Sequence, residues 1–335
     1  MKIHDRTLPL YLNQHLQAMS DISFPQLIRR GCGIDVHQKV VVATIDGEGI
    51  SQETRSFETF TSSLTSLKEW LLSNGVTHVA MESTGVYWKP VHKVLEDAIP
   101  NVWIVNARHI KNVPGHKTDV MDSKWICKLL LAGLLKPSYI PPKEQRQLRD
   151  LTRYRNKLIQ HVSSEKNRII RILEDCNIKL SSVLSSTSGV TATKLIDILC
   201  SGRAVTMADV QEVYHKRIAA TPEELLEACT GFVEEHHIYM LQMINRDIDQ
   251  TEKLIAEISE RIKALLSKYE NVLELLREIP GFSHKSVEDL VAEIGLDMGH
   301  FPSEKHLASW AGVCPGNNES AGKKKAGESL TETNK

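Results

Sequence analysis

The chain has 335 residues, of which 41% are hydrophobic and 25% charged, and its formal net charge is −1. This composition excludes extensive disorder, and the length suffices for about two or three domains. No run of about 18 apolar residues is present and the six cysteines form no CxxC pair, so the sequence predicts no membrane span, zinc site or disulfide framework.

The first half of the chain predicts an α/β layer. Residues 1–30 show little pattern and are expected to be a lead-in segment. Strands are then expected in GIDVH, KVVVATID, THVAMES and NVWIVNA, with a polar stretch followed by a helix near TSLKEWLLSNG before the third of them. Because strands and helices alternate, residues 31–142 are expected to form one α/β domain.

Four carboxylates of this domain occupy similar structural positions. Two end predicted strands, and two lie three residues apart where a helix through DVMDSKWICKLLLAGLL begins: Asp35, Glu82, Asp119 and Asp122. A buried acid/base pair would need only two of them, whereas four in one place would repel each other without a cation. Carboxylates are hard oxygen ligands, so the pattern predicts a divalent-metal site suited to phosphoryl transfer on nucleic acids.

The segment KPSYIPPKEQ contains three prolines and ends this domain, and residues 143–270 are expected to be helical. Apolar residues recur at heptad spacing from Leu148 to Ile172, interrupted by Arg155 and Glu165. A second, uninterrupted series comprises Leu241, Ile244, Ile248, Thr251, Ile255, Ile258, Ile262 and Leu265. This spacing predicts a coiled coil, within one chain or between subunits. Two core helices of a bundle are the alternative.

Residues 271–335 predict a small, mainly α C-terminal domain. LREIPGFSHKSVEDLVAEIG resembles a helix-hairpin-helix, whose turn presents N–H groups to a DNA phosphate, although Ser283 replaces the second glycine. A plain helical corner is the alternative. Further on, Ser320 precedes three lysines that could hold a phosphate near its hydroxyl. The alternative is a basic loop without catalytic function.

Charge is distributed unevenly along the chain. Residues 143–179 hold ten basic and five acidic residues, whereas residues 207–260 hold four basic and twelve acidic ones. A basic region can bind a phosphate backbone, although solvated helix faces would give the same pattern. The candidate nucleic-acid contacts are Arg108, Lys111, Lys117, Arg146, Arg149, Arg153, Lys323, Lys324 and Lys325.

Five segments resemble, in order, the DEDD transposases of bacterial insertion sequences, also called bridge-RNA-guided recombinases. They are GIDVHQKVVVATIDGEG, AMESTGVYWKPV, VNARHIKNVPGHKTDVMDSKWICKLLLAGLL, REIPGFSHKSVEDLVAEIG and FPSEKHLASWAGVCPGNNESAGKKK. Five ordered segments are more specific than any single motif. The resemblance implies a RuvC-like domain of the ribonuclease H fold, a coiled-coil region and a C-terminal transposase domain.

The resemblance also implies a function. The acidic tetrad would match Asp35, Glu82, Asp119 and Asp122, which would bind Mg²⁺ or Mn²⁺, and the nucleophilic serine would match Ser320. The expected partners are the element's DNA ends, the target DNA, a structured RNA encoded by the element and further copies of the chain. The expected location is the bacterial cytoplasm, at the nucleoid when DNA is bound.

Two other functions stay open. A structure-selective endonuclease of the RuvC type would need only the tetrad and water. Because the chain ends soon after the serine loop, a shortened C-terminal domain is also expected, and the protein would then be an inactive remnant that binds nucleic acid.

Overall fold

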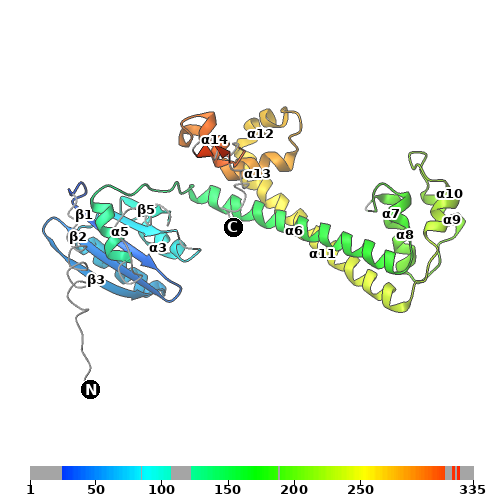
Figure 1. Cartoon of the computed structure of the whole chain (residues 1–335), viewed down its shortest axis with the longest axis horizontal. Helices are drawn as coiled ribbons and strands as arrows, with labels where there is room; N and C mark the ends of the chain where they lie inside the picture. Colours follow the sequence, from blue (N-terminus) through cyan, green and yellow to red (C-terminus); the bar gives the residue numbers. More distant parts are fainter. Residues whose placement is uncertain are drawn as a thin grey trace, which may run out of the picture. The chain divides into compact units, whose positions relative to one another are not determined.

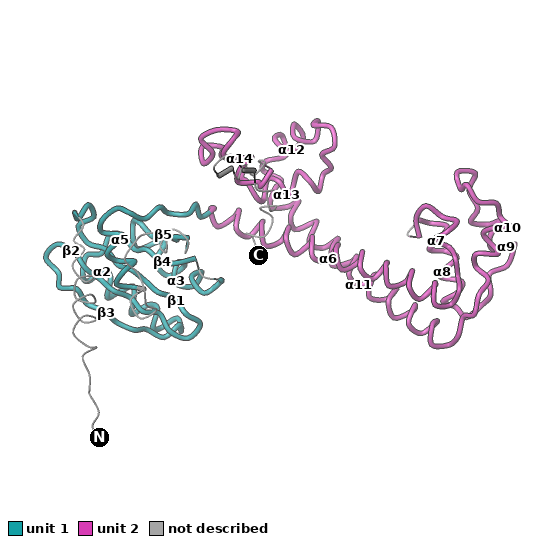
Figure 2. Tube along the Cα trace, in the orientation of Figure 1, with its two compact units in different colours: residues 1–140 teal, residues 141–335 magenta. Residues whose placement is uncertain are grey.

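The structure, a computed structural model, describes residues 25–83, 85–106, 122–187 and 189–313, with the backbone of residues 319–320 and 323–324. The chain divides into two compact units, Met1–Ile140 and Pro141–Lys335 (Figure 2). Among the described helices, none combines the length and the apolar character that crossing a membrane requires.

A five-stranded mixed sheet forms the middle of the N-terminal unit (Figure 1). Its strands are β1 (Arg30–Val36), β2 (Val40–Gly47), β3 (Ile50–Glu58), β4 (His78–Glu82) and β5 (Asn101–Val105). Their order across the sheet is β3-β2-β1-β4-β5, with β1 to β3 antiparallel and β4 and β5 parallel to β1. This is the topology of the ribonuclease H fold, so the expected α/β ribonuclease H-like domain is confirmed.

Helices cover both faces of this sheet. They are α2 (Thr61–Ser73), α3 (Trp88–Leu95) and α5 (Asp122–Leu131). The first two pack on one face, where Leu67 and Leu95 meet strand residues such as Ile34. Helix α5 packs on the other face, where Leu130 meets Ala80. Both faces are covered because side chains of successive strand residues alternate between them.

Strand β3 corrects an expectation, since its residues were predicted only as a polar stretch. None of its nine residues is fully buried, and only Ile50, Glu53 and Phe57 are partly covered. The strand lies at the sheet edge, where backbone hydrogen bonds to β2 hold it without a buried face. An edge strand therefore lacks the apolar alternation by which strands are recognised in a sequence.

Two long helices run side by side in the C-terminal unit, α6 (Lys143–Asp175) and α11 (Glu235–Leu266) (Figure 1). They are antiparallel, because Glu144 pairs with Lys268 at one end and Asp175 with His237 at the other. The buried residues of the pair are Leu148, Thr152, Arg155, Val162, Glu165, Ile169 and Leu173 on α6, and Leu241, Ile244, Ile248, Thr251, Ile262 and Leu266 on α11. The heptad positions of the two helices thus include a row of buried side chains, while supercoiling of the helices stays a prediction.

Shorter helices pack at the two ends of this pair. They are α7 (Leu180–Val183), α8 (Val190–Cys200), α9 (Met207–Val213), α10 (Pro222–Ala228), α12 (Glu270–Arg277), α13 (His284–Ile294) and α14 (Glu304–Trp310), with short 3-10 turns at Ser267–Tyr269 and Met298–His300. Between α12 and α13, Gly281 has a φ of 90°. The Ser283 hydroxyl then accepts a hydrogen bond from the Ser286 N–H and caps α13, which explains a serine at this place.

The cysteines behave as packing residues. Five of them, Cys32, Cys127, Cys176, Cys200 and Cys229, are free and buried, and Cys314 lies outside the described residues. Burial raises the pKa of the Cys127 thiol to about 12. These thiols are therefore protonated at neutral pH and unreactive.

Candidate active site

Asp35 and Glu82 lie at the same end of two adjacent parallel strands. The register pairs Ile34 of β1 with Met81 of β4, so the two acidic residues follow side by side, one residue further on. Neighbouring strands lie about 4.8 Å apart. Two carboxylates at this spacing can reach one cation.

Both carboxylates belong to the sheet face that carries α5. Because side chains alternate along a strand, Asp35 shares its face with Gly33, and Glu82 shares its face with Ala80. Gly33 lies against the α5 backbone, and Ala80 packs in the cluster formed by α5. Helix α5 begins at Asp122, so a third predicted acidic position starts on the same face.

Helix α5 is held very close to the sheet. A Cβ atom added at Gly33 would lie 2.2 Å from the backbone nitrogen of Cys127 and 2.2 Å from the carbonyl oxygen of Ser123. The Ser123 hydroxyl is 2.9 Å from that of Thr44, which is itself 2.9 Å from that of Thr54. Since Thr44 and Ser123 are buried, this hydroxyl chain fixes the first turn of α5, and with it the backbone of Asp122.

A histidine partners the first carboxylate. Nε2 of His37 lies 2.8 Å from Oδ2 of Asp35, and the two side chains are 59% and 18% exposed. The Asp35 carboxylate thus offers an oxygen to a positively charged or hydrogen-bonding partner at the accessible C-terminal end of β1. Carboxylate oxygens such as those of Asp35 and Glu82 are the ligands that a hard divalent cation prefers. Sequence analysis did not single out His37, although its place two residues after Asp35 on one strand face was the available signal.

Several predicted site residues lie outside the described residues. These are Asp119, Arg108, Lys111, Lys117 and Lys325. The backbone alone is described for Asp122, Ser320, Lys323 and Lys324. Two short strands, β6 (Glu319–Ser320) and β7 (Lys323–Lys324), pair antiparallel and place Ser320 opposite Lys323. The serine segment thus contains a pair of short strands, where sequence analysis expected a loop.

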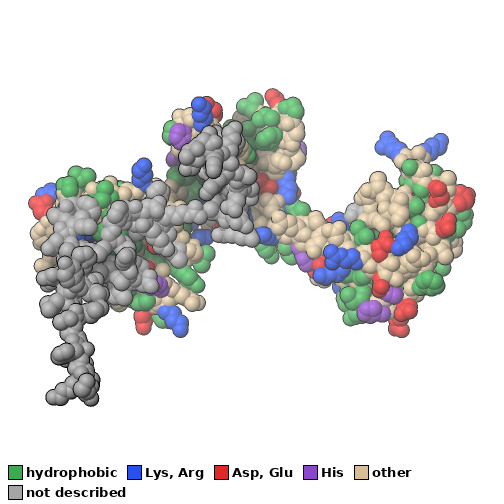
Figure 3. Space-filling view, viewed as in Figure 1, with side chains coloured by type: hydrophobic (Ala, Val, Ile, Leu, Met, Phe, Trp, Pro, Cys, Tyr) green, Lys and Arg blue, Asp and Glu red, His purple; other side chains and the backbone are tan. Residues whose placement is uncertain are grey.

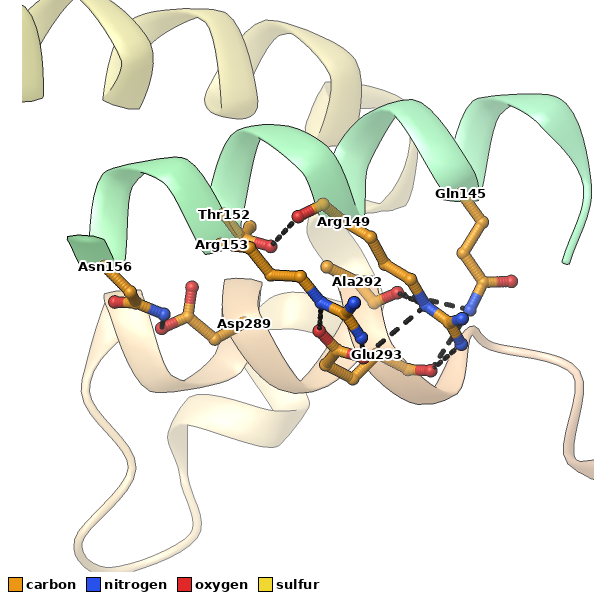
Figure 4. A network of polar contacts seen from close by, with 8 residues as sticks. All are labelled: Gln145, Arg149, Thr152, Arg153, Asn156, Asp289, Ala292 and Glu293. Atoms are coloured by element: carbon orange, nitrogen blue, oxygen red, sulfur yellow. Dashed lines mark hydrogen bonds and ion pairs between the residues drawn. The ribbon is translucent and has the colours of Figure 1, made fainter. Parts of the chain in front are cut away.

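Two of the predicted DNA-binding arginines hold α13 against α6 (Figure 4). The Arg149 guanidinium donates to the carbonyl oxygens of Ala292 and Glu293 in the last turn of α13. Arg153 binds the Glu293 carboxylate through two hydrogen bonds of 2.7 and 2.8 Å. Positive charge at a helix C-terminus is favourable because the last carbonyls lack partners within the helix. Sequence analysis missed this structural role.

The third of these arginines has a local contact. Arg146 donates to the carbonyl oxygen of Pro141 at 3.2 Å. The side chains of Arg149 and Arg153 are 20% and 64% exposed, so Arg153 keeps more of its surface accessible. A phosphate contact by any of these residues stays a prediction.

A ribonuclease H-like sheet with carboxylates at the ends of β1 and β4 points to the class of enzymes that act on nucleic-acid phosphodiesters. Within this class, a family model described as "Transposase", of the DEDD IS110 type, matches residues 32–178. A second, described as "Transposase IS116/IS110/IS902 family", matches residues 273–334. The two matches cover more than half of the chain, which belongs to the IS110 family of DEDD transposases. It is therefore a DNA-binding and DNA-cutting enzyme of an insertion sequence.

A solved structure shares weak similarity with this chain. The RuvC structure of Thermus thermophilus is 16% identical, and the match covers 33% of this chain and 83% of RuvC. Its TM-score is 0.23, so the fold assignment above rests on strand order and direction instead. A comparison with curated proteins found no match.

Proposed function

We propose that this transposase cuts and rejoins DNA through a covalent serine intermediate, with Mg²⁺ or Mn²⁺ held by Asp35, Glu82, Asp119 and Asp122. The observation that carries the proposal is the register of β1 and β4. It sets two carboxylates side by side on the face from which α5 begins. When bound, the metal would polarise the scissile phosphodiester and stabilise charge on its oxygens.

The chain's own residues would perform the transfer as follows. The Ser320 hydroxyl loses its proton and its oxygen attacks phosphorus, so that a phosphoserine bond forms and the DNA sugar oxygen leaves as a hydroxyl. The hydroxyl of a second strand then attacks the same phosphorus and releases Ser320. Each step breaks one ester bond and forms another, so no nucleotide cofactor is consumed. Lys323, opposite Ser320 in the pair of short strands, would stabilise the charge that develops there.

Nucleic-acid contacts are proposed for the basic residues. Arg108, Lys111, Lys117, Arg146, Arg149, Arg153, Lys323, Lys324 and Lys325 would contact DNA phosphates. Arg153 is the best supported of the described arginines because its side chain is 64% exposed. The turn between α12 and α13 would present backbone N–H groups to a further phosphate, as helix-hairpin-helix elements do.

Two further partners are proposed from the family resemblance. A structured RNA encoded by the element would pair with donor and target DNA, which would place the choice of sequence outside the protein. Copies of the chain would associate through the coiled-coil region, along the outer faces of the α6 and α11 pair, because the heptad lines are buried within each chain. The chain would then have four parts: a lead-in segment (residues 1–30), the domain with the metal site (31–142), the coiled-coil region (143–270) and the C-terminal domain with the serine (271–335).

The proposal predicts a Mg²⁺-dependent covalent protein–DNA adduct with the element's own DNA ends. Ser320→Ala and Asp35→Asn are each expected to lower adduct formation and recombination at least about 10³-fold, because one removes the nucleophile and the other a metal ligand. DNA affinity should stay nearly unchanged. Adduct is measured by denaturing gel electrophoresis, and affinity by gel shift at fixed salt concentration.

Ser309→Ala is the matched control, since Ser309 is an exposed serine on α14 in the same unit. It should form adduct normally. Metal-dependent cleavage that leaves free ends, depends on Asp35 and is unaffected by Ser320→Ala would contradict the covalent scheme and select the RuvC-type endonuclease. Neither adduct nor cleavage from the wild-type chain would select the inactive remnant.

A further inference from the structure

The helix pair α6 and α11 gathers a second group of potential metal ligands. His161 and Glu165 lie one turn apart on α6, and Asp247 faces them from α11. Nε2 of His161 is 2.7 Å from Oδ2 of Asp247. One ligand atom from each of the three residues lies within 4.8 Å of the others, in the only such group among the residues that the structure describes.

Glu165 is the unusual member of this group. It interrupts the apolar heptad series of α6, and its side chain is only 7% exposed. A buried carboxylate costs free energy unless a positive charge compensates it. Its ion pair is with Arg168, at 3.0 Å on the same helix, and that side chain is 57% exposed. Nothing in this pair reaches across to α11, although the adjacent His161 and Asp247 do.

The other interruption of the series is compensated differently. Arg155 has a side chain 3% exposed and meets two carboxylates, Glu288 at 2.5 Å and Asp289 at 2.8 Å, which come from α13. The buried arginine is thus neutralised from a different helix. Glu165, in contrast, is paired with Arg168 of its own helix, and two further potential metal ligands, His161 and Asp247, lie beside it.

We propose that His161, Glu165 and Asp247 bind a zinc-class divalent cation that links α6 to α11. Zn²⁺ is bound by imidazole nitrogen and carboxylate oxygen at about 2.0–2.2 Å, with water in the remaining position of a tetrahedron. Tetrahedral ligands at that distance lie roughly 3.4 Å from each other, so small side-chain rotations bring the present group into range. Two carboxylates also neutralise the charge of the ion.

Mg²⁺ is the wrong ion for this group, because it selects oxygen ligands in octahedral geometry and imidazole suits Zn²⁺. The site is therefore chemically different from the site proposed at Asp35 and Glu82. A bound ion would join two helices that are otherwise held in this region by side-chain packing and exposed ion pairs. The inference is independent of the proposed DNA chemistry.

Zinc binding to the full chain, purified without a polyhistidine tag, tests the proposal. Asp35→Asn and Glu82→Gln are included to remove zinc binding at the proposed catalytic site. The probe is Zn²⁺ alone, titrated in competition with a chromophoric chelator in excess Mg²⁺. One zinc per chain is expected, and His161→Ala, Glu165→Gln or Asp247→Asn should each weaken its binding at least about tenfold.

The pair of His237 and Asp175 provides a matched control. It joins the same two helices at 3.2 Å, and among the described residues no third ligand atom completes a group within 4.8 Å there. Asp175→Asn should therefore leave zinc affinity and stoichiometry unchanged. His161 and Asp247 are each 46% exposed, so their variants are expected to fold, which circular dichroism checks. Equal zinc binding by the parent and the His161→Ala variant, or an equal loss in Asp175→Asn, would overturn the proposal. No DNA is used, so neither result bears on the proposed function.

Discussion

Gly33→Ala is expected to abolish DNA cleavage and recombination and to destabilise the N-terminal unit by about 3 kcal/mol or more. The added Cβ would lie 2.2 Å from two backbone atoms of α5, which belong to Ser123 and Cys127. Backbone atoms cannot rotate away as the end of a side chain can. The helix would have to move as a whole, and it carries Asp122 at its first residue. Thermal unfolding and the adduct assay measure the two effects.

Gly31→Ala is the control on the same strand and the same face. Its added Cβ would meet the side-chain carbons of Leu130 at 3.1 Å and Leu131 at 3.2 Å, which can shift by a few tenths of an ångström. We expect this variant to keep most of its stability and activity. If both alanine variants lost stability and activity to the same extent, the prediction that α5 tolerates no side chain at Gly33 would be contradicted.

Arg155→Ala is expected to weaken the attachment of α13 to α6 by about 3–5 kcal/mol. The substitution leaves the carboxylates of Glu288 and Asp289 without their buried guanidinium, and Asn156 supplies only one hydrogen bond to Asp289. Unpaired carboxylates in such a place are costly because little water reaches them. Hydrogen exchange of the α13 amides measures the effect locally, and their protection should fall about 10²–10⁴-fold.

Arg153→Ala is the matched control for this prediction. Arg153 also binds a carboxylate of α13 through two hydrogen bonds, but its side chain is 64% exposed. Solvent screens such a pair, so its loss should cost about 1 kcal/mol or less. Equal loss of α13 protection in both variants would contradict the distinction between buried and exposed pairs, on which this prediction depends.

The sequence was informative wherever an element has a buried face with a regular period. Strands β1, β2, β4 and β5 carry apolar runs, so their places could be predicted, and the heptad series of α11 predicted a helix with one buried face. Strand β3 could not be predicted in this way, because an edge strand is held by the backbone hydrogen bonds of its neighbour. The side chains of β3 therefore show almost no pattern from which this pairing could be predicted.

The candidate site also has features that the sequence predicts and features that it does not. Strand and helix ends are local features, so the positions of Asp35, Glu82 and Asp122 followed from periodicity alone, as did the interruption of the α6 series by Glu165. The close approach at Gly33, the hydroxyl chain from Ser123 to Thr54, and the binding of Arg149 to α13 all join residues far apart in the chain. Contacts of this kind leave no local pattern in the sequence. Each residue type involved is common, and its contact partner is decided only by the tertiary fold.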